Sequence, residues 1–340
     1  MRSSRIGRRA ALFLAAVPLL ASRAQAAEPI RLGLLQTLSP APFYLAQEFG
    51  FWREAGADVT FRFFQAAQPI AAAAVSGDID VGVTALTGGF FSLAEKGALR
   101  VIGGALHEQK GFEGSAILVS AKAHAEGLDD VKKLAGHSVA ITQYGSSFHY
   151  MVGRIAEASG FDVKSVTLRP VQTVANMVAA VRTGQVDATI AIASMARPVA
   201  ATGEARIIGW AGDVVPYQIT ALFTTAAMID ARPDDLRRFA AGYRRGVSAF
   251  RRAFLRLDEA GRPIHDADTD KAIAAISKYI FVGDADAGRK IIDGVGYYDA
   301  DGALDVADVA DQLRWFRAQG LVKGDADPAS VIDTRFLPTR

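Results

Sequence analysis

The sequence predicts an α/β protein of two similar lobes, each a mainly parallel sheet flanked by helices. Two segments that lie 107 positions apart, 72–81 and 179–188, read almost alike. Each contains the end of an Ala-rich helix, a Gly that can close the helix, and the start of a short apolar strand. Because this unit recurs at a domain-sized spacing, we expect two lobes that face each other across a cleft, where small ligands bind.

The N-terminal segment has the pattern of a secretory signal peptide. Arginines precede an apolar run over 10–21, and Ala24-Gln25-Ala26 supplies a cleavage site of small residues. The apolar run is much shorter than the roughly 20 residues that a membrane-spanning helix needs. We therefore assign 1–26 to a signal peptide and start the mature chain near Ala27. The pair Arg8-Arg9 leaves the export route open between the Sec and twin-arginine pathways.

Charge and cysteine content narrow the class of protein. The chain has 38 basic and 36 acidic residues, and the first 26 residues carry five arginines and no acid, which leaves 33 basic and 36 acidic residues. This balance gives no reason to expect a nucleic-acid partner. The chain contains no cysteine, so it forms no disulfide and cannot carry a lipid anchor that needs a cysteine at the cleavage point. We predict a soluble, monomeric protein of the periplasm.

The first series of elements starts directly after the signal peptide. Alternation of apolar and polar residues predicts a strand over 59–64. Gln68-Pro69 opens the first Ala-rich helix, which Gly77 closes. Helices between strands imply a mainly parallel sheet. The other elements expected here are strands over 30–34, 79–83, 99–105 and 115–119, and helices over 42–50 and 90–94.

The second series repeats this order. Tyr144-Gly145-Ser146-Ser147 turns into a helix that ends at Gly160, and Thr173 caps the second Ala-rich helix. Everything after Pro233 is expected to be helical, and the last helix ends at Gly320. The other elements expected are a short helix over 128–134 and strands over 138–141, 166–168, 188–192, 206–210 and 219–225.

The order of the elements implies that the second lobe is inserted into the first. Strands near 115–120 and 219–225 flank the second series, and we expect them to cross between the lobes and form a hinge. The expected division is a signal peptide over 1–26, lobe 1 over 27–118 plus 221–340, and lobe 2 over 119–220.

The sequence carries no catalytic signature. Without cysteine there is no thiol nucleophile and no cysteine-based metal site. The histidines form no zinc motif, and there is no nucleophile elbow, phosphate-binding loop or dinucleotide fingerprint. Asp299-Ala300-Asp301-Gly302 lacks the ligand ladder of a calcium loop, and we interpret it as a turn. We therefore expect a protein that is not an enzyme and uses no metal or cofactor.

Residues that follow the strands are the better candidates for function, because open α/β sheets receive ligands at the carboxyl ends of their strands. The free N–H groups and hydroxyls of Gly145-Ser146-Ser147 could hold an anionic oxygen, or could form an ordinary helix cap. Thr84 and Thr87 occupy the matching place in the first lobe, and they too could either hold a ligand or cap a helix. The predicted ligand-binding residues are Thr37, Leu38, Ser39, Gln65, Thr84, Thr87, His107, Tyr144, Gly145, Ser146, Ser147, His149, Ser194, Trp210 and Asp213.

With these motifs in place, the chain resembles the periplasmic substrate-binding proteins of ABC importers of the nitrate, sulfonate and taurine type, which include the NMT1/THI5-like proteins. The resemblance covers nearly all of the mature chain. It rests on the segments Pro42 to Trp52 with Gly56-Ala57-Asp58-Val59, Gly77 to Thr84, Leu134 to Ala140 with Tyr144 to Ser147, and Gly184 to Ala188.

The resemblance implies the type II periplasmic binding protein fold, closure of two lobes around a small-molecule ligand, and delivery to a permease in the inner membrane. It implies ligand contacts from Thr37-Leu38-Ser39, Thr84, Gly145-Ser146-Ser147 and the region of Ser194. We see no distinctive arginine in the cleft loops, which favours an organic anion, a sulfonate or carboxylate, aromatic or not, over an inorganic one. The alternatives are a neutral heteroaromatic such as a thiamine-pyrimidine or flavin precursor, and a secreted enzyme on the same fold.

Overall fold

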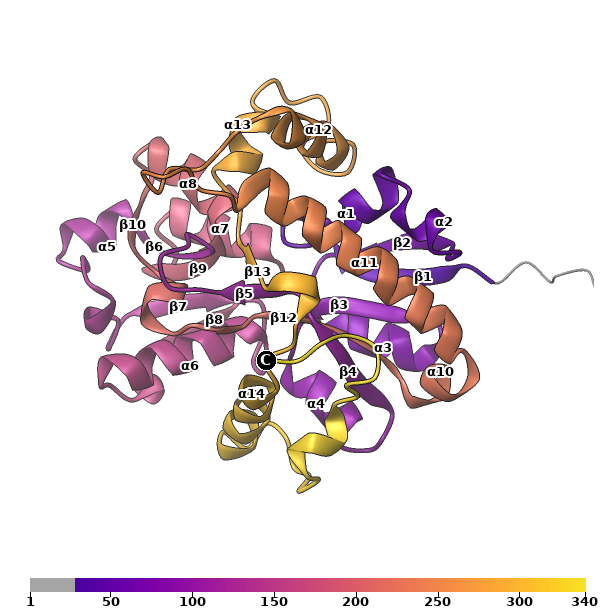
Figure 1. Ribbon diagram of the computed structural model, residues 1–340. Coiled ribbons are helices and arrows are strands. Elements are labelled where there is room, and N and C mark those ends of the chain that lie inside the picture. The colour runs from indigo at the N-terminus through magenta and orange to yellow at the C-terminus, as the bar shows by residue number, and fades with distance from the viewer. Residues whose placement is uncertain (1–27) are drawn as a thin grey trace, which may run out of the picture.

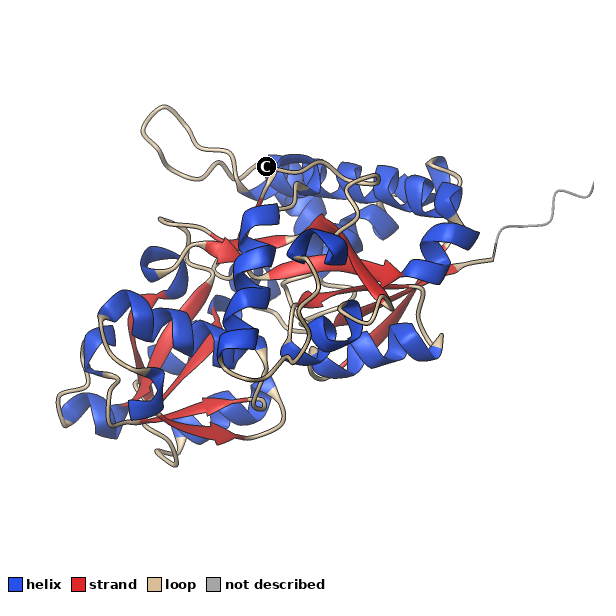
Figure 2. Ribbon diagram, turned by 90° about the horizontal axis from the view of Figure 1, so that it is seen from below, coloured by secondary structure: helices blue, strands red, loops and turns tan. Residues whose placement is uncertain are grey.

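The computed structural model describes residues 28–340, which form two lobes side by side (Figure 1). The strands of the two lobes form separate groups, and helices cover both groups (Figure 2). The predicted signal peptide over 1–26 lies outside the described residues. No helix within residues 28–340 combines the length and the apolar character that crossing a membrane requires.

The sheet of the first lobe has one antiparallel strand among parallel ones. In spatial order its strands are β2 (Val59–Phe64), β1 (Ile30–Leu35), β3 (Val81–Ala85), β12 (Thr220–Thr225) and β4 (Leu99–Gly104). The strand β1 pairs in parallel with β2 and β3, whereas β12 is antiparallel to both β3 and β4. The one antiparallel strand is therefore the one that returns from the second lobe.

The sheet of the second lobe has the same design. In spatial order its strands are β8 (Thr167–Pro170), β7 (Ser138–Ile141), β9 (Ala188–Ile192), β6 (Ser115–Ser120) and β10 (Ala205–Trp210). The strand β7 pairs in parallel with β8 and β9, whereas β6 is antiparallel to β9 and β10. The predicted fold class, two lobes with mainly parallel sheets and flanking helices, is confirmed.

Helices connect the strands and cover the sheets. The first lobe contains α1 (Ala41–Glu48), α2 (Phe51–Glu54), α3 (Gln68–Ser76) and α4 (Gly88–Ala94). The second contains α5 (Ala121–Ala125), α6 (Ser147–Ser159), α7 (Val174–Arg182), α8 (Ala193–Ala201) and α9 (Ala211–Val214). The helices that follow β12 are α10 (Ala226–Ala231), α11 (Pro233–Phe254), α12 (Ala267–Ile276), α13 (Ala287–Ile292) and α14 (Val306–Ala318).

The repeated sequence unit holds β1 in place in the first sheet and β7 in the second. Gly77 and Gly184 both have the left-handed backbone, with φ of 81° and 68°. The Asp80 carboxylate accepts hydrogen bonds from the backbone N–H and the guanidinium of Arg31, each at 2.8 Å. Asp187 accepts from the backbone N–H and the hydroxyl of Ser138, also at 2.8 Å. The two pairs are again 107 positions apart, so the repeat is structural as well as sequential.

The lobes are joined by a small third sheet, which the sequence did not predict. Its strands are β11 (Tyr217–Gln218), β5 (Leu106–Glu108) and β13 (Tyr297–Tyr298), with β5 in the centre. The chain therefore crosses between the lobes at β5 and β11.

The segments 115–120 and 219–225, predicted to cross, instead lie in opposite sheets as β6 and β12, so this prediction is wrong. The strand at 115–119 belongs to the second sheet and does not complete the first. An apolar run predicts a strand but not its pairing partner. The boundaries at 118 and 220 stay a prediction.

The segment after Pro233 is not entirely helical, contrary to the prediction. It contains β13, and residues 319–340 run along the first lobe with only one short 3₁₀ helix, Pro328–Val331. Isolated bridges from Val101 to Ile332 and from Leu304 to Thr339 attach this segment to the lobe. The remaining 3₁₀ helices of the described chain are Val131–Lys133, Val163–Ser165 and Ala300–Gly302.

The helix α14 packs against both lobes. The Phe316 ring lies 5.7 Å from that of Phe91 in α4 and 5.8 Å from that of Tyr150 in α6. At its start, the half-buried Asp308 carboxylate accepts hydrogen bonds from the backbone N–H of Gln218 and the side-chain amide of Gln312. Burial raises the pKa of Asp308 to about 6. This carboxyl thus ties α14 to β11.

We expect Asp80→Ala to lower the free energy of unfolding by about 1–3 kcal/mol, because it leaves the N–H of Arg31 without its partner. The exposed Asp78, two positions away, is the control, and Asp78→Ala should change stability by less than about 0.5 kcal/mol. Urea denaturation measures both. Equal effects of the two substitutions would contradict the role given to Asp80.

Asp308→Asn tests the half-buried carboxyl, since asparagine keeps the acceptor oxygen and cannot ionise. A carboxyl with a raised pKa stabilises the fold below its unfolded pKa of about 3.9, and this contribution disappears as the pH rises through about 6. The free energy of unfolding of the variant, relative to that of the natural sequence, should therefore rise by about 1–3 kcal/mol as the pH is raised from 4 to 7. Urea denaturation across this range measures the difference, and a difference independent of pH would contradict the assignment.

Candidate functional site

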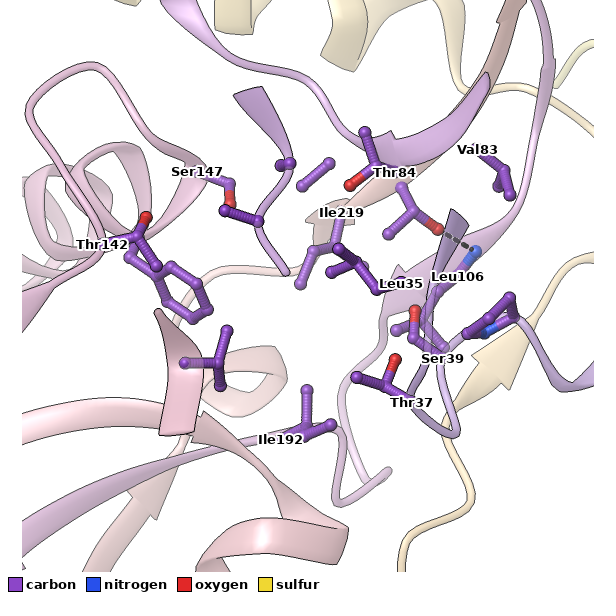
Figure 3. A pocket seen from close by; sticks show the side chains of 17 residues that line it. Leu35, Thr37, Ser39, Val83, Thr84, Leu106, Thr142, Ser147, Ile192 and Ile219 are labelled. Carbon is purple, nitrogen blue, oxygen red and sulfur yellow. Dashed lines mark hydrogen bonds between the residues drawn. The ribbon is translucent and has the colours of Figure 1, made fainter. Parts of the chain in front are cut away.

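A cavity lies between the two lobes, where the carboxyl ends of the parallel strands of both sheets face each other (Figure 3). The first lobe lines it with Leu35, Thr37, Ser39, Pro40, Ala66, Ala67, Val83, Thr84 and Ala85. The second lobe and the crossing segments add Thr142, Ser147, Phe148, Val174, Ile192, Leu106, Ile219 and Thr220.

Five helices begin at this cavity. Three lining residues lie directly before a helix: Pro40 before α1, Ala67 before α3 and Ile192 before α8. Two more are the first residues of their helices: Ser147 in α6 and Val174 in α7. The first backbone N–H groups of a helix have no partner within the helix, and the helix dipole makes this end positive. The convergence of these ends therefore favours a negatively charged group in the cavity.

Hydroxyl groups are the only polar side chains in the lining, which contains no charged residue. Among the described residues that line it, the hydroxyl oxygens of Thr37 and Thr84 have no hydrogen-bond partner. Buried polar groups usually have partners, so an exception calls for an explanation. A ligand with hydrogen-bonding atoms would supply the missing partner for both.

The rest of the lining is apolar. Leu35, Val83, Phe148, Ile192 and Ile219 contribute aliphatic and aromatic surface from both lobes and from the crossing segment. Figure 3 shows Thr142 and Ser147 on one side of the cavity and Thr37 and Ser39 on the other. The arrangement can hold a molecule with an apolar body and a compact polar head.

At one end of the cleft the two lobes are in direct contact. The backbone N–H of Gly88, the first residue of α4, donates to the carbonyl oxygen of Gly145 at 2.9 Å. Gly145 adopts a left-handed backbone with φ of 75°, which turns its carbonyl towards the first lobe at the start of α6. This hydrogen bond joins the lobes on the side where α14 also contacts both.

The structure distributes the predicted ligand-binding residues over several places. Thr37, Ser39, Thr84 and Ser147 line the cavity. Leu38 and Ser194 do not line it, and instead line neighbouring hollows. Gln65 is exposed, and the backbone of Ala66 and Ala67 takes its place at the cavity.

Three other predicted residues cap or support helix ends outside the lining. The hydroxyl of Ser146 accepts from the N–H of His149, and that of Thr87 accepts from the N–H of Phe90. The Nδ1 atom of His149 accepts from the backbone N–H of Gly145 at 3.2 Å, and burial lowers the pKa of His149. Ser146 and Thr87 thus form ordinary helix caps, which is the alternative to ligand binding that the sequence left open for both loops.

The remaining predicted residues lie away from the lining. His107 is buried against Arg340, and burial together with that guanidinium lowers the pKa of His107 to about 4. Tyr144 is 56% exposed. Trp210 packs under the Arg197 guanidinium at 5.4 Å, and the Asp213 carboxylate accepts from the N–H of Gly111 at 2.9 Å. A role of these residues in ligand binding stays a prediction.

Several lining residues escaped the sequence analysis because they are apolar or lie in the crossing segments. Thr142 could have been found, since it lies 107 positions after Leu35, and Leu35 ends β1 while Thr142 directly follows β7. Phe148 and Val174 are the second and first residues of α6 and α7, which the capping pattern placed correctly. Ile219 and Thr220 lie at the start of the strand predicted over 219–225, whereas no sequence signal indicates that the chain crosses at Leu106.

Two lobes of this strand order with a cavity between them define the class of periplasmic binding proteins. Within that class, the chain belongs to the NMT1/THI5-like family, whose model matches residues 38–252. A comparison with curated proteins gives no significant match.

Solved structures show the same fold. The alkanesulfonate-binding protein SsuA from Xanthomonas axonopodis pv. citri bound to MOPS is 19% identical, with a TM-score of 0.69 over 90% of this chain and 98% of that one. The periplasmic nitrate-binding protein NrtA from Synechocystis is 15% identical, with a TM-score of 0.66 over 89% and 84%. DszB, as a cysteine-to-serine mutant in complex with biphenyl-2-sulfinic acid, is 14% identical, with a TM-score of 0.56 over 91% and 97%. At these identities the likeness establishes the fold alone.

Thr84→Val tests whether the Thr84 hydroxyl is unpaired in the free protein. We expect the substitution not to lower the free energy of unfolding, because it removes a hydroxyl that makes no hydrogen bond. The control is Thr189→Val, which removes a buried hydroxyl that donates to the carbonyl oxygen of Ala140 at 2.9 Å. It should lower stability by about 1 kcal/mol. Equal losses in urea denaturation would mean that the Thr84 hydroxyl has a partner within the protein.

Proposed function

We propose that this protein is the solute-binding component of an ABC importer and that it captures a small organic anion, a sulfonate or a carboxylate, in the cavity between its lobes. The observation that carries the proposal is the convergence of five helix N-termini on a cavity lined by hydroxyls and apolar groups. Family membership and the predicted signal peptide support a periplasmic protein that delivers its ligand to a membrane permease.

The anionic head would accept hydrogen bonds from helix N-termini and from the hydroxyls of Thr37, Thr84 and Ser147. Because these groups come from both lobes, the ligand makes its full set of contacts only when the lobes are close together. Binding then shifts the population towards the closed state, which the permease recognises.

The chemistry of the cavity lining argues for an organic ligand over a small inorganic anion. The lining within residues 28–340 contains no arginine or lysine that would clamp an inorganic anion. Apolar side chains cover most of the surface, and an organic body would pack against them.

A binding role fits this lining better than catalysis does. The side chains at the cavity offer hydroxyls and no carboxylate, imidazole or amine that could act as a general acid or base. The fold also occurs in DszB, so an enzyme on the same fold is the rival from another class. Recovery of any bound compound chemically unchanged after prolonged incubation supports binding, and its conversion supports the enzyme.

The rival ligand class is a neutral heteroaromatic. Phe148 favours it, because this ring lines the cavity and could stack on a flat ligand. A thermal-shift panel of sulfonates, carboxylates, nitrate, pyrimidines and flavins separates the two classes. A ligand at 100 times its Kd stabilises the protein by about 2.7 kcal/mol, which such an assay detects readily. Stabilisation by pyrimidines or flavins and by no anion would overturn the proposal.

Ser147→Ala and Ser146→Ala form a matched pair of tests on adjacent residues. We expect Ser147→Ala to weaken binding of a sulfonate by about 1–3 kcal/mol, because its hydroxyl lines the cavity. Ser146→Ala removes a helix cap and should lower stability by about 1 kcal/mol with little change in Kd. Calorimetric titration and urea denaturation measure the two effects. An unchanged Kd for Ser147→Ala would contradict the placement of the head group.

A further inference from the structure

The cleft does not end at the cavity, and we propose that its continuation is a subsite for an apolar tail, so that the ligands of this protein are organic anions with an extended aliphatic or aromatic substituent. The proposal rests on the proposed function and adds a substrate class to it. The observation behind it is a groove that shares Thr37 and Ile192 with the cavity.

The groove is lined mostly by apolar side chains from three separate parts of the chain. The loop after β1 gives Leu38, the start of α8 gives Met195, and the segment 279–282 after α12 gives Ile280, Phe281 and Val282. Its polar side chains come from Gln36, Thr37, Ser194 and Tyr279. Among these lining residues there is no charged side chain, so the groove would bind a second charged group poorly.

The position of the groove gives the ligand a direction. At one end of the cleft, the Gly88–Gly145 hydrogen bond and α14 hold the lobes together. The groove opens between α8 and the α12–α13 connection, on the opposite side of the molecule from α4, α6 and α14 (Figure 1). A molecule whose head is held in the cavity can therefore extend towards the groove and away from the contact between the lobes.

The segment 279–282 is held firmly enough to form a wall. The side-chain amide of Gln36 donates to the carbonyl oxygen of Tyr279 at 2.9 Å, which ties the segment to the loop after β1. The Tyr279 hydroxyl donates to Glu48 at 2.6 Å, and its ring stacks on Tyr44 at 4.6 Å. The wall is thus anchored at Tyr279 from both the loop and α1.

Beyond Tyr279 the segment has a strained backbone and an exposed apolar side chain, both of which destabilise the fold. Phe281 has a φ of 55°, a left-handed conformation that a bulky residue rarely adopts. Val282 is 72% exposed at the rim of the groove. Backbone strain of this kind persists where the surroundings enforce it and often marks a site of function. An apolar tail in the groove would cover both side chains.

The test is a series of sulfonates that share one head and differ in tail length, namely methane-, butane-1- and octane-1-sulfonate, titrated by calorimetry. If the tail enters the groove, Kd falls by about fourfold for each fully buried CH2 group. Met195→Ala and Val282→Ser should each weaken octane-1-sulfonate by about threefold to tenfold and leave methanesulfonate unchanged. Leu257→Ser, at an exposed leucine outside the groove, is the control and should change neither.

The outcomes separate the two proposals. Two results would overturn the tail subsite and leave the proposed function intact. The first is equal affinity for all three sulfonates. The second is an equal loss of affinity for short and long sulfonates in the groove variants. Binding of no sulfonate and no carboxylate would overturn the proposed function itself. A pyrimidine that binds with a Kd sensitive to Met195→Ala would also contradict the anionic head while locating the ligand in this cleft.

Discussion

Parallel strands of one sheet end at the same edge, and the helices that follow them begin there. Both lobes obey this constraint with the same strand order, and the crossing strands β5 and β11 set the two edges face to face. Five helix N-termini thus meet at one cavity without any charged side chain in its lining. In the proposed function, the positive ends of helices, rather than arginine or lysine, select an anionic ligand. Each helix end contributes only about 0.3–1 kcal/mol, so several must act together.

The sequence predicted the repeated architecture well, because the cause of the repeat is local. Gly77 and Gly184 end their helices in the left-handed conformation, and Asp80 and Asp187 then fix β1 and β7. The pairing of the strand at 115–120 could not be predicted, since its apolar run fits either sheet equally well. The path of residues 319–340 depends on contacts such as that of Val101 with Ile332, which no local pattern indicates.

The lining of the cavity was predicted in part. Thr37, Ser39, Thr84 and Ser147 lie at or after the carboxyl ends of strands, and position along the chain was enough to place them at the cavity. Sequence could not separate Ser147, which lines the cavity, from the adjacent cap Ser146. His107, Tyr144 and Trp210 were chosen for their chemistry, yet burial and side-chain direction place them away from the lining, and only the fold decides these. Apolar lining residues such as Phe148 and Ile219 look like ordinary core residues in a sequence.

The central claim is that helix ends select an anionic head, and a charge-matched pair of ligands tests it most directly. Butane-1-sulfonate and butane-1-sulfonamide have nearly the same shape, and only the first is charged at neutral pH. If several helix ends act together, the sulfonate should bind at least tenfold more tightly, a difference of about 1.4 kcal/mol or more. Equal affinity, or tighter binding of the sulfonamide, in calorimetric titration would contradict the account.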